Sequence, residues 1–345
     1  MAEKQIAVVV RQYNKEEPTK AIDVVEKAIR EPGQGQAQVR MIYRPINPSD
    51  IFCCQGIYGG FRPKLPAAPG LEGVGIITKL GPRATSRTTH TARQLKEGRR
   101  VVGVPWPSAE GEGTWQQYVN VPFEHLIPVR DEVSSEDAAQ YLINPVTALG
   151  FLEDLKVPPG KYLLQNAANS VLGKELISLA KRRGTKLINV VRRDEAANEL
   201  KQLGAEVVIN SKTENVVDRV MEITGNEGAW AVINPIGGEA SRPFFSAVRE
   251  GGLIYIFSLF GEVVIVPMYD LHFRDITVRG FWLNKWLGRL SKEEREGKLL
   301  EVMDYMADGT IKPPPPRAKY HLKDVKAAMK EAMKGGSQGK ILLEG

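Results

Sequence analysis

Hydrophobic positions divide the chain into two parts with different periods. Up to about residue 125, short apolar runs rich in β-branched residues alternate with glycine and proline, a pattern typical of strands. The expected strands are Ile6–Val10, Gln38–Tyr43, Gly73–Leu80, Arg100–Val104 and Trp115–Val121. The first part is therefore predicted to be a small β-rich domain.

From Ser134 the apolar spacing becomes helical, with a break expected near Pro145. Strands and helices then alternate. The predicted strands are Glu206–Ile209, Trp230–Asn234, Leu253–Phe257 and Ile276–Phe281, and the helical segments between them include Val216–Thr224 and Pro243–Val248. Such alternation is typical of a doubly wound parallel sheet, so the fold class is predicted to be α/β, with this sheet beside the β-rich domain.

The C-terminal part has a different character. A charged amphipathic helix is expected over Lys292–Met306, followed by the stiff run Pro313–Pro316. A helix over Lys323–Lys334 and a short strand over Ile341–Leu343 come next, and this tail is expected to return to the first domain. Pro82–Arg99, rich in Arg, Thr and Ser, is predicted to be an exposed loop.

Composition narrows the function classes. The chain has 345 residues, 42% of them hydrophobic and 26% charged, with a net charge of +6. No apolar run approaches the length of a membrane span, and no basic–aromatic groove indicates nucleic acid. The modest positive charge suits acidic partners. The adjacent Cys53 and Cys54 are poorly placed to pair with each other, which favours a reducing compartment.

The most informative segment is a βαβ unit that begins at Lys161. Leu163 and Leu164 follow a Pro-Pro-Gly breaker as a buried strand, a helix runs over Leu172–Ala180, and Leu187–Val191 is a second buried strand. The strand-to-helix turn of such a unit presents backbone N–H groups and a positive helix end to a phosphate. Of the G-x-G-x-x-G pattern only Gly173 is present, so the motif alone is weak.

The end of the second strand indicates which dinucleotide binds. NAD sites usually place a carboxylate there for the ribose 2′-OH, whereas arginine suits a 2′-phosphate. Arg192 and Arg193 occupy this place, and Asp194 follows them. The sequence therefore predicts NADPH as the cofactor, with Arg192 and Arg193 as its ligands. The alternative is that both arginines only face water.

Eight segments together resemble the medium-chain dehydrogenases/reductases, and more narrowly the mitochondrial-type trans-2-enoyl-thioester reductases. They are Asn47-Pro-Ser-Asp-Ile51, Gln55-Gly-Ile-Tyr58, Pro69-Gly-Leu-Glu-Gly73, Gly113-Thr-Trp115, Asn144-Pro-Val-Thr-Ala148, Gln165-Asn-Ala-Ala-Asn-Ser170, Ile188-Asn-Val-Val-Arg192 and Arg279-Gly-Phe-Trp-Leu283. The resemblance implies a GroES-like catalytic domain over residues 1–125 and 284–345. It also implies a Rossmann NADPH-binding domain over residues 126–283, and a homodimer.

The same resemblance implies roles for individual residues. Tyr58 matches the proton donor; the alternative is a loop aromatic that caps a cleft. Expected cofactor contacts are Asn144, Thr147, Asn169, Ser170, Val171, Leu172, Phe257, Ser258 and Lys340. Phe281, Trp282 and Leu283 are also placed at the cofactor site, where they would line an acyl pocket and help the dimer, or alternatively form ordinary core. Asp50 and Glu72 are expected to be structural carboxylates.

Metal chemistry is not expected. Catalytic and structural zinc sites in this superfamily need Cys and His ligands that two adjacent cysteines and four scattered histidines do not supply, and position 71 is Leu rather than His. An alcohol dehydrogenase is thereby disfavoured. Conjugate reduction of an activated C=C bond fits better, and the resemblance implies NADPH-dependent reduction of trans-2-enoyl thioesters, carried by CoA or an acidic acyl carrier protein, in fatty acid synthesis. The alternatives are a zinc-free quinone or alkenal reductase and a non-catalytic NADPH-binding protein.

Met1-Ala-Glu-Lys leads directly into the first apolar strand, so no presequence is visible. The expected location is the mitochondrial matrix if a presequence has been removed, and the cytoplasm otherwise.

Overall fold

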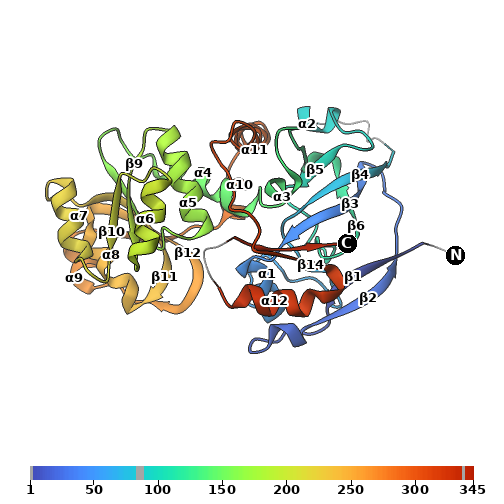
Figure 1. Ribbon diagram of the computed structural model, residues 1–345, viewed down its shortest axis with the longest axis horizontal. Helices are drawn as coiled ribbons and strands as arrows, with labels where there is room; N and C mark the ends of the chain where they lie inside the picture. The colour runs from blue at the N-terminus through green and yellow to red at the C-terminus, as the bar shows by residue number, and fades with distance from the viewer. Residues whose placement is uncertain (1–2, 83–88, 336–338) are drawn as a thin grey trace. The chain divides into compact units, whose positions relative to one another are not determined.

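The protein, seen here as a computed structural model, divides into two compact units (Figure 1). The structure describes residues 3–82, 89–335 and 339–345. Unit 1 comprises Met1–Ile143 and Glu296–Gly345, and unit 2 comprises Asn144–Arg295.

Unit 1 is built on β-structure. A seven-stranded sheet has the order β14-β15-β3-β4-β5-β7, with β6 paired to β3, and a hairpin of β1 and β2 forms a separate two-stranded sheet. The strands are β1 (Lys4–Val10), β2 (Ile22–Ala28), β3 (Gln36–Pro45), β4 (Val74–Leu80), β5 (Arg100–Gly103), β6 (Tyr118–Pro122), β7 (Leu126–Pro128), β14 (Ala318–His321) and β15 (Ile341–Glu344). Because β15 pairs antiparallel with β3, the C-terminal segment returns to this unit, as expected.

Among the described residues of unit 1, two hydrophobic clusters stand out in the core. One gathers apolar side chains around Trp115 and the other around Trp106, both of which are almost fully buried. The helices of the unit are α1 (Pro48–Gln55), α2 (His90–Arg93), α3 (Ser135–Ala138) and α12 (Val325–Met333), with 3₁₀ turns η1 (Pro18–Lys20), η2 (Phe123–His125) and η4 (Leu322–Asp324). The helix α11 (Lys292–Ala307) contributes most of its length to unit 1.

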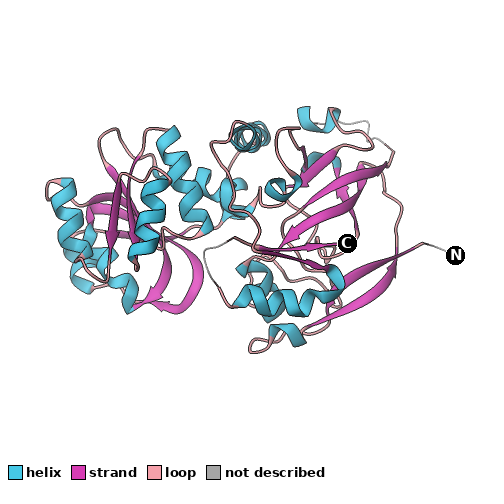
Figure 2. Cartoon of the chain, in the orientation of Figure 1, coloured by secondary structure: helices cyan, strands magenta, loops and turns pink. Residues whose placement is uncertain are grey.

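Unit 2 is a doubly wound α/β domain. Its six strands follow the order β10-β9-β8-β11-β12-β13, and every neighbouring pair is parallel. They are β8 (Tyr162–Gln165), β9 (Lys186–Val191), β10 (Val207–Asn210), β11 (Ala229–Gly238), β12 (Val248–Val264) and β13 (Thr277–Gly280). The helices are α4 (Ile143–Leu155), α5 (Val171–Arg182), α6 (Asp194–Gln202), α7 (Val216–Thr224), α8 (Arg242–Ala247), α9 (Met268–Phe273) and α10 (Leu283–Leu287), with the turn η3 (Glu239–Ser241) (Figure 2).

The strand order of unit 2 reverses direction between β8 and β11. Right-handed crossovers therefore place α5 and α6 on one face of the sheet and α7 and α8 on the other, where these two helices contact each other. This is the Rossmann arrangement, and the predicted fold class is confirmed. In such sheets ligands bind at the carboxyl ends of the strands beside the reversal, which here are β8 and β11.

Three local expectations need correction. The break expected near Pro145 comes earlier, before Ile143, and Pro145 lies in the first turn of α4, where its missing N–H is tolerated. The strand expected to end at Phe257 continues to Val264, because β11 and β12 keep pairing beyond a register shift after Asn234.

The third correction concerns the segment expected to be an exposed loop, Pro82–Arg99. Residues 83–88 fall outside the described residues, but 90–93 form α2, and Leu95 is 3% exposed in the core around Trp106. A helix of four residues is too short for its apolar spacing to be recognised in the sequence. Among the described residues, no helix has both the length and the apolar character needed to span a bilayer.

Candidate functional site

The turn between β8 and α5 in unit 2 is shaped to meet a phosphate. Ala167 adopts φ +52° at the point where glycine is common in such turns. Ser170 caps α5, because its Oγ accepts a hydrogen bond from the Gly173 amide at 3.1 Å. Among the described residues, no acceptor meets the amides of Val171 and Leu172. Two backbone donors and the positive end of a helix therefore remain available at this turn.

Gly173 lets the turn pack closely on the helix. A Cβ at this position would lie 2.4 Å from the carbonyl oxygen of Ala168, so any side chain would displace the turn backbone. Gln165, at the end of β8, donates through Nε2 to the Gly173 carbonyl at 3.1 Å and to Asn189 Oδ1 at 2.7 Å. These bonds tie the first turn of α5 to the end of β8 and to the middle of β9.

The arginine pair lies at the end of β9. Arg192 and Arg193 are exposed, and neither guanidinium has a hydrogen bond or an ion pair within the described parts of the chain. The next residue, Asp194, accepts a hydrogen bond through Oδ1 from the side-chain amide of Asn210 at 2.6 Å. The carboxylate beside the arginines is thus engaged with the protein, while the two guanidinium groups are free to meet an anion.

The other expected cofactor contacts of unit 2 fall into two groups. Asn144 and Thr147 lie on the first turn of α4, three residues apart and so on one side of the helix. Phe257 and Phe281 instead pack against Phe151, with ring centroids 4.9 and 4.6 Å from it. Phe281 is 6% exposed and belongs to this aromatic cluster.

The remaining expected contacts of unit 2 are less buried. Trp282 and Leu283 are partly exposed at the start of α10, and Ser258 is partly exposed on β12. Tyr255, whose ring packs on Phe281 in the aromatic cluster, donates its hydroxyl to Asp154. Burial, together with this carboxylate, raises the pKa of Tyr255 to about 12.

Tyr58 lies in unit 1, just after helix α1. Gly56 ends the helix at φ +74°, and a Cβ there would meet the ring of Tyr13 at 2.6 Å, so the turn requires glycine. The Tyr58 amide donates to the Phe52 carbonyl at 3.3 Å. Its ring is partly buried against the core around Trp115. The chain thus leaves the helix in a defined direction with Tyr58 at its end.

Arg62 is a contact that sequence reasoning missed. Its Nη1 donates to the carbonyl oxygens of Tyr58 and Phe61, each at 3.0 Å. This arginine closes the turn that carries Tyr58, and no sequence motif signals such a side-chain-to-backbone contact. Cys53 and Cys54, on the preceding helix, are buried free thiols, and burial raises the pKa of both.

A buried polar cluster lies at the other end of α1. Asp50 accepts hydrogen bonds from the amides of Asn47 and Leu71, and Asn47 donates through Nδ2 to Glu72 at 3.0 Å. Lys340 donates to the side chain of Asn47. Burial raises the pKa of Asp50 to about 7, and neighbouring Glu72 adds to the rise, although the two backbone bonds and Lys340 oppose it.

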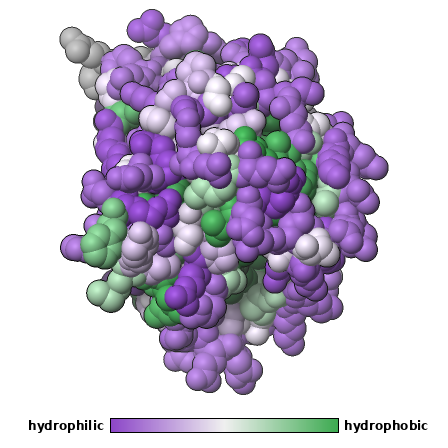
Figure 3. All heavy atoms as spheres, turned by 90° about the vertical axis from the view of Figure 1, so that its left-hand side faces the viewer, coloured by the Kyte–Doolittle hydropathy of each residue, from purple (hydrophilic) through white to green (hydrophobic). Residues whose placement is uncertain are grey.

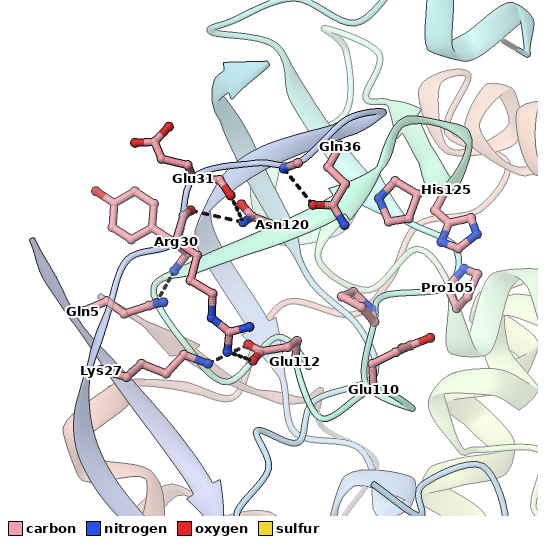
Figure 4. A pocket seen from close by; sticks show the side chains of 14 residues that line it. Gln5, Lys27, Arg30, Glu31, Gln36, Pro105, Glu110, Glu112, Asn120 and His125 are labelled. Atoms are coloured by element: carbon pink, nitrogen blue, oxygen red, sulfur yellow. Dashed lines mark hydrogen bonds and ion pairs between the residues drawn. The ribbon is translucent and has the colours of Figure 1, made fainter. Parts of the chain in front are cut away.

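A hollow of about 450 Å³ on unit 1 contains none of the expected site residues (Figure 4). Three of its charged groups pair with one another, since Lys27 and Arg30 both contact Glu112. Asn120 donates to the backbone carbonyls of Arg30 and Glu31. Across the described ranges, no three or more His, Cys, Asp or Glu side chains are grouped to hold a metal ion.

Two family models match the chain. Residues 33–131 match the alcohol dehydrogenase GroES-like domain, and residues 171–303 match the zinc-binding dehydrogenase domain. Among solved structures, a candidate NADPH:quinone reductase from Bacillus thuringiensis is 28% identical, with a TM-score of 0.89 and full coverage of both chains. Escherichia coli quinone oxidoreductase, solved with NADPH, is 25% identical with a TM-score of 0.83 over 99% of this chain and 100% of that one.

A mutant enoyl thioester reductase from Candida tropicalis shares the fold, with a TM-score of 0.83 at 22% identity, over 99% of this chain and 100% of that one. The mitochondrial enoyl-[acyl-carrier-protein] reductase of Caenorhabditis elegans is 33% identical over 303 residues, which is 86% of this chain and 83% of that protein. The human protein of the same name is 30% identical over 333 residues, which cover 95% of this chain and 86% of that protein. The chain therefore belongs to the medium-chain dehydrogenase/reductase superfamily, within the family of the mitochondrial enoyl-[acyl-carrier-protein] reductases, and is an oxidoreductase.

Proposed function

We propose that this protein reduces the C2=C3 double bond of trans-2-enoyl thioesters with NADPH. The observation that carries the proposal is the similarity, over most of both chains, to proteins named mitochondrial enoyl-[acyl-carrier-protein] reductases. The substrate's carrier is CoA or an acidic acyl carrier protein, and the reaction belongs to fatty acid synthesis. Because those relatives are named mitochondrial, the proposed location is the mitochondrion.

Unit 2 is the proposed NADPH-binding unit. The free amides at the start of α5 suit the pyrophosphate, and Gly173 lets the turn pack closely against the helix that presents them. Arg192 and Arg193, exposed and without ion pairs among the described residues, suit the 2′-phosphate. Bound NADPH would supply the hydride for Cβ. Asn144 and Thr147 are the proposed contacts of the nicotinamide end.

Unit 1 is the proposed source of the proton. A phenol has a pKa near 10, so it is protonated at neutral pH and can donate without a further base. Tyr58 is the proposed donor to Cα, and Arg62 holds the turn on which it lies. Negative charge on the thioester oxygen needs nearby hydrogen-bond donors, which the side chains of Asn144 and Thr147 can supply.

The second candidate is a zinc-free quinone reductase. It is favoured by the likeness to the Bacillus thuringiensis and Escherichia coli proteins, whose names specify quinone reduction. The two reactions share the cofactor and differ in the acceptor, so products distinguish them.

The proposed reaction is tested with NADPH deuterated at nicotinamide C4, on the transferred face, and trans-2-hexenoyl-CoA as substrate. The expected product is hexanoyl-CoA with one deuterium at Cβ. When the reaction is run in D₂O with unlabelled NADPH, the product should instead carry one deuterium at Cα. Mass spectrometry and NMR detect both labels. Recovery of unreduced enoyl-CoA while 1,4-benzoquinone consumes the cofactor would replace this proposal with the second candidate.

A further inference from the structure

Helix α4 begins on a carboxylate from a distant part of the sequence, and the two residues that it contacts, Leu142 and Ile143, belong to unit 1 as it does. Glu72, which is 1% exposed, accepts hydrogen bonds through Oε1 from the amides of Leu142 at 2.7 Å and Ile143 at 2.6 Å. The first amides of a helix have no partner within the helix, and a negative charge at this end is favourable. Glu72 therefore acts as the N-terminal cap of α4, from 71 positions before Ile143.

The second oxygen of Glu72 needs its own donor, because a buried carboxylate with an unsatisfied oxygen is costly. That donor is Asn47 Nδ2, at 3.0 Å. The other end of the same amide, Oδ1, accepts from Lys340 Nζ. A lysine ammonium only donates, so it can face only the oxygen of the amide. Lys340 thereby fixes which way Asn47 points, and keeps Nδ2 toward Glu72.

We infer that Lys340, Asn47 and Glu72 form a clamp that positions the first turn of α4 for catalysis, with Lys340 as a positioning residue that acts through the orientation of the Asn47 amide. The inference rests on the proposed function in one respect, because Asn144 and Thr147, the proposed nicotinamide contacts, lie one and four residues after Ile143 on that helix. It also gives Lys340 a task other than direct contact with the cofactor.

The test replaces Lys340 by Met, which keeps the length of the stem and removes the ammonium. Hydrogen exchange of the 140–147 peptide is expected to become about tenfold faster, the scale of a lost hydrogen bond to a charged group. The turnover number kcat should fall by about tenfold, since reacting groups tolerate little misplacement. The Kd for NADPH, held mainly by the α5 turn and the arginines, should change by less than about threefold.

Two controls sharpen this test. Lys340→Arg keeps a donor-only cation and is expected to restore slow exchange and most of kcat. Lys334→Met removes a lysine of the same C-terminal segment whose side chain is 71% exposed, and should leave exchange, kcat and Kd unchanged.

A compensating pair tests the orientation of the amide itself. In Glu72→Gln, the two backbone amides hold the oxygen end of the new side chain, so its NH₂ group faces Asn47 Nδ2. Two NH₂ groups then face each other, and Lys340 prevents the Asn47 amide from turning. Residues 140–147 should therefore exchange faster in the single variant than in the unmodified protein. Adding Lys340→Met frees Asn47 to turn its oxygen toward that NH₂ group. The double variant should therefore exchange more slowly than Glu72→Gln alone, a non-additive result.

The outcomes separate this inference from the proposed function. Exchange needs no substrate, so an inactive enzyme still reports on the clamp. Unchanged exchange in Lys340→Met with a raised Kd would mean that Lys340 contacts NADPH directly. Additive effects in the double variant would likewise overturn the proposed role of the Asn47 amide.

Discussion

At the scale of single residues, the proposed chemistry depends on side chains whose neighbours restrict them. Tyr58 follows a helix that ends at a required glycine, and the Arg62 guanidinium holds the Tyr58 carbonyl. Arg192 and Arg193 differ, because no protein group among the described residues forms an ion pair with them. The first arrangement favours a fixed proton donor, and the second favours an anionic ligand.

Replacing Tyr58 by Phe removes the proposed proton donor and keeps the ring that packs in unit 1. Turnover with an enoyl thioester is expected to fall by about a hundredfold, the scale of general acid catalysis. NADPH affinity, measured by fluorescence, should stay nearly unchanged. Turnover equal to that of the unmodified protein would remove Tyr58 from the mechanism.

The double change Arg192→Ala with Arg193→Ala is expected to weaken NADPH binding by at least about tenfold, while NADH binding changes little, since only NADPH carries the 2′-phosphate. Titration of both cofactors by calorimetry measures this. Arg182→Ala, on the exposed last turn of α5, serves as the matched control. Equal losses for both cofactors would contradict the proposed role of the arginines.

Asp50 predicts a pH dependence of stability. Its pKa is about 7 in the folded protein against an ordinary value of 3.8, so between these pH values the folded state binds more protons than the unfolded state. Stability from this group is therefore full below about pH 3.8 and is lost as pH rises through about 7.

Thermal unfolding at pH 5 and pH 8 checks this sign. The Tm advantage of the unmodified protein over Asp50→Asn should shrink as the pH rises. Asp131→Asn, with a side chain that is 87% exposed, is the control, and its difference should stay constant. If this Tm difference instead grew as the pH rose, the folded state would favour the ionised form of Asp50 over the protonated form.

At the scale of elements, the β8–α5 turn combines a capped helix with a close backbone approach. The Ser170 cap contributes about 1 kcal/mol by the usual scale, whereas a Cβ at Gly173 would lie 2.4 Å from the Ala168 carbonyl oxygen and would displace the turn. The two positions therefore have different tasks, one in helix stability and one in the shape of the phosphate site.

Paired variants separate these tasks. Ser170→Ala is expected to lower the free energy of unfolding by about 1 kcal/mol. Gly173→Ala is expected to weaken NADPH binding by more than about tenfold, because the displaced turn no longer presents its amides. Denaturant unfolding and cofactor titration measure the two effects. Full NADPH affinity in Gly173→Ala would mean that the turn does not hold the pyrophosphate.

At the scale of the whole molecule, unit 2 exposes apolar side chains that a solitary chain would leave in water. Met268, Tyr269 and Phe273 of α9 are 84%, 67% and 67% exposed. Green apolar atoms appear among the polar ones on the face seen in Figure 3. Within the described residues, β13 also ends the six-stranded sheet with an unpaired edge. Large apolar patches and open edges favour association, so we propose a homodimer through unit 2.

Light scattering after gel filtration is expected to give twice the 38.2 kDa of the chain. Met268→Glu with Phe273→Glu should yield a monomer, because a two-fold contact places both charges in the interface twice. Met333→Glu, which alters a side chain that is 44% exposed on α12 of unit 1, should leave the dimer intact. A monomeric unmodified protein would contradict the proposal.

Much of unit 2 was predictable from the sequence. Buried parallel strands leave continuous apolar runs, which is why β8 and β9 lie where the pattern predicts them, and the helical spacing of apolar residues in the same way locates α7. The short helix α2 and the extension of β12 were not predictable, since they depend on packing and pairing with distant segments. The same limit applies to Arg62 and to the Glu72 cap of α4. The roles expected for Tyr58 and the cofactor contacts remain predictions.

The most direct test of the central claim compares acceptors. NADPH oxidation is followed at the nicotinamide absorbance with trans-2-hexenoyl-CoA, trans-2-decenoyl-CoA and 1,4-benzoquinone in parallel. The account predicts that kcat/KM for at least one thioester exceeds that for the quinone. A quinone value above both thioesters, or bound NADPH with no turnover on any of the three, would contradict it.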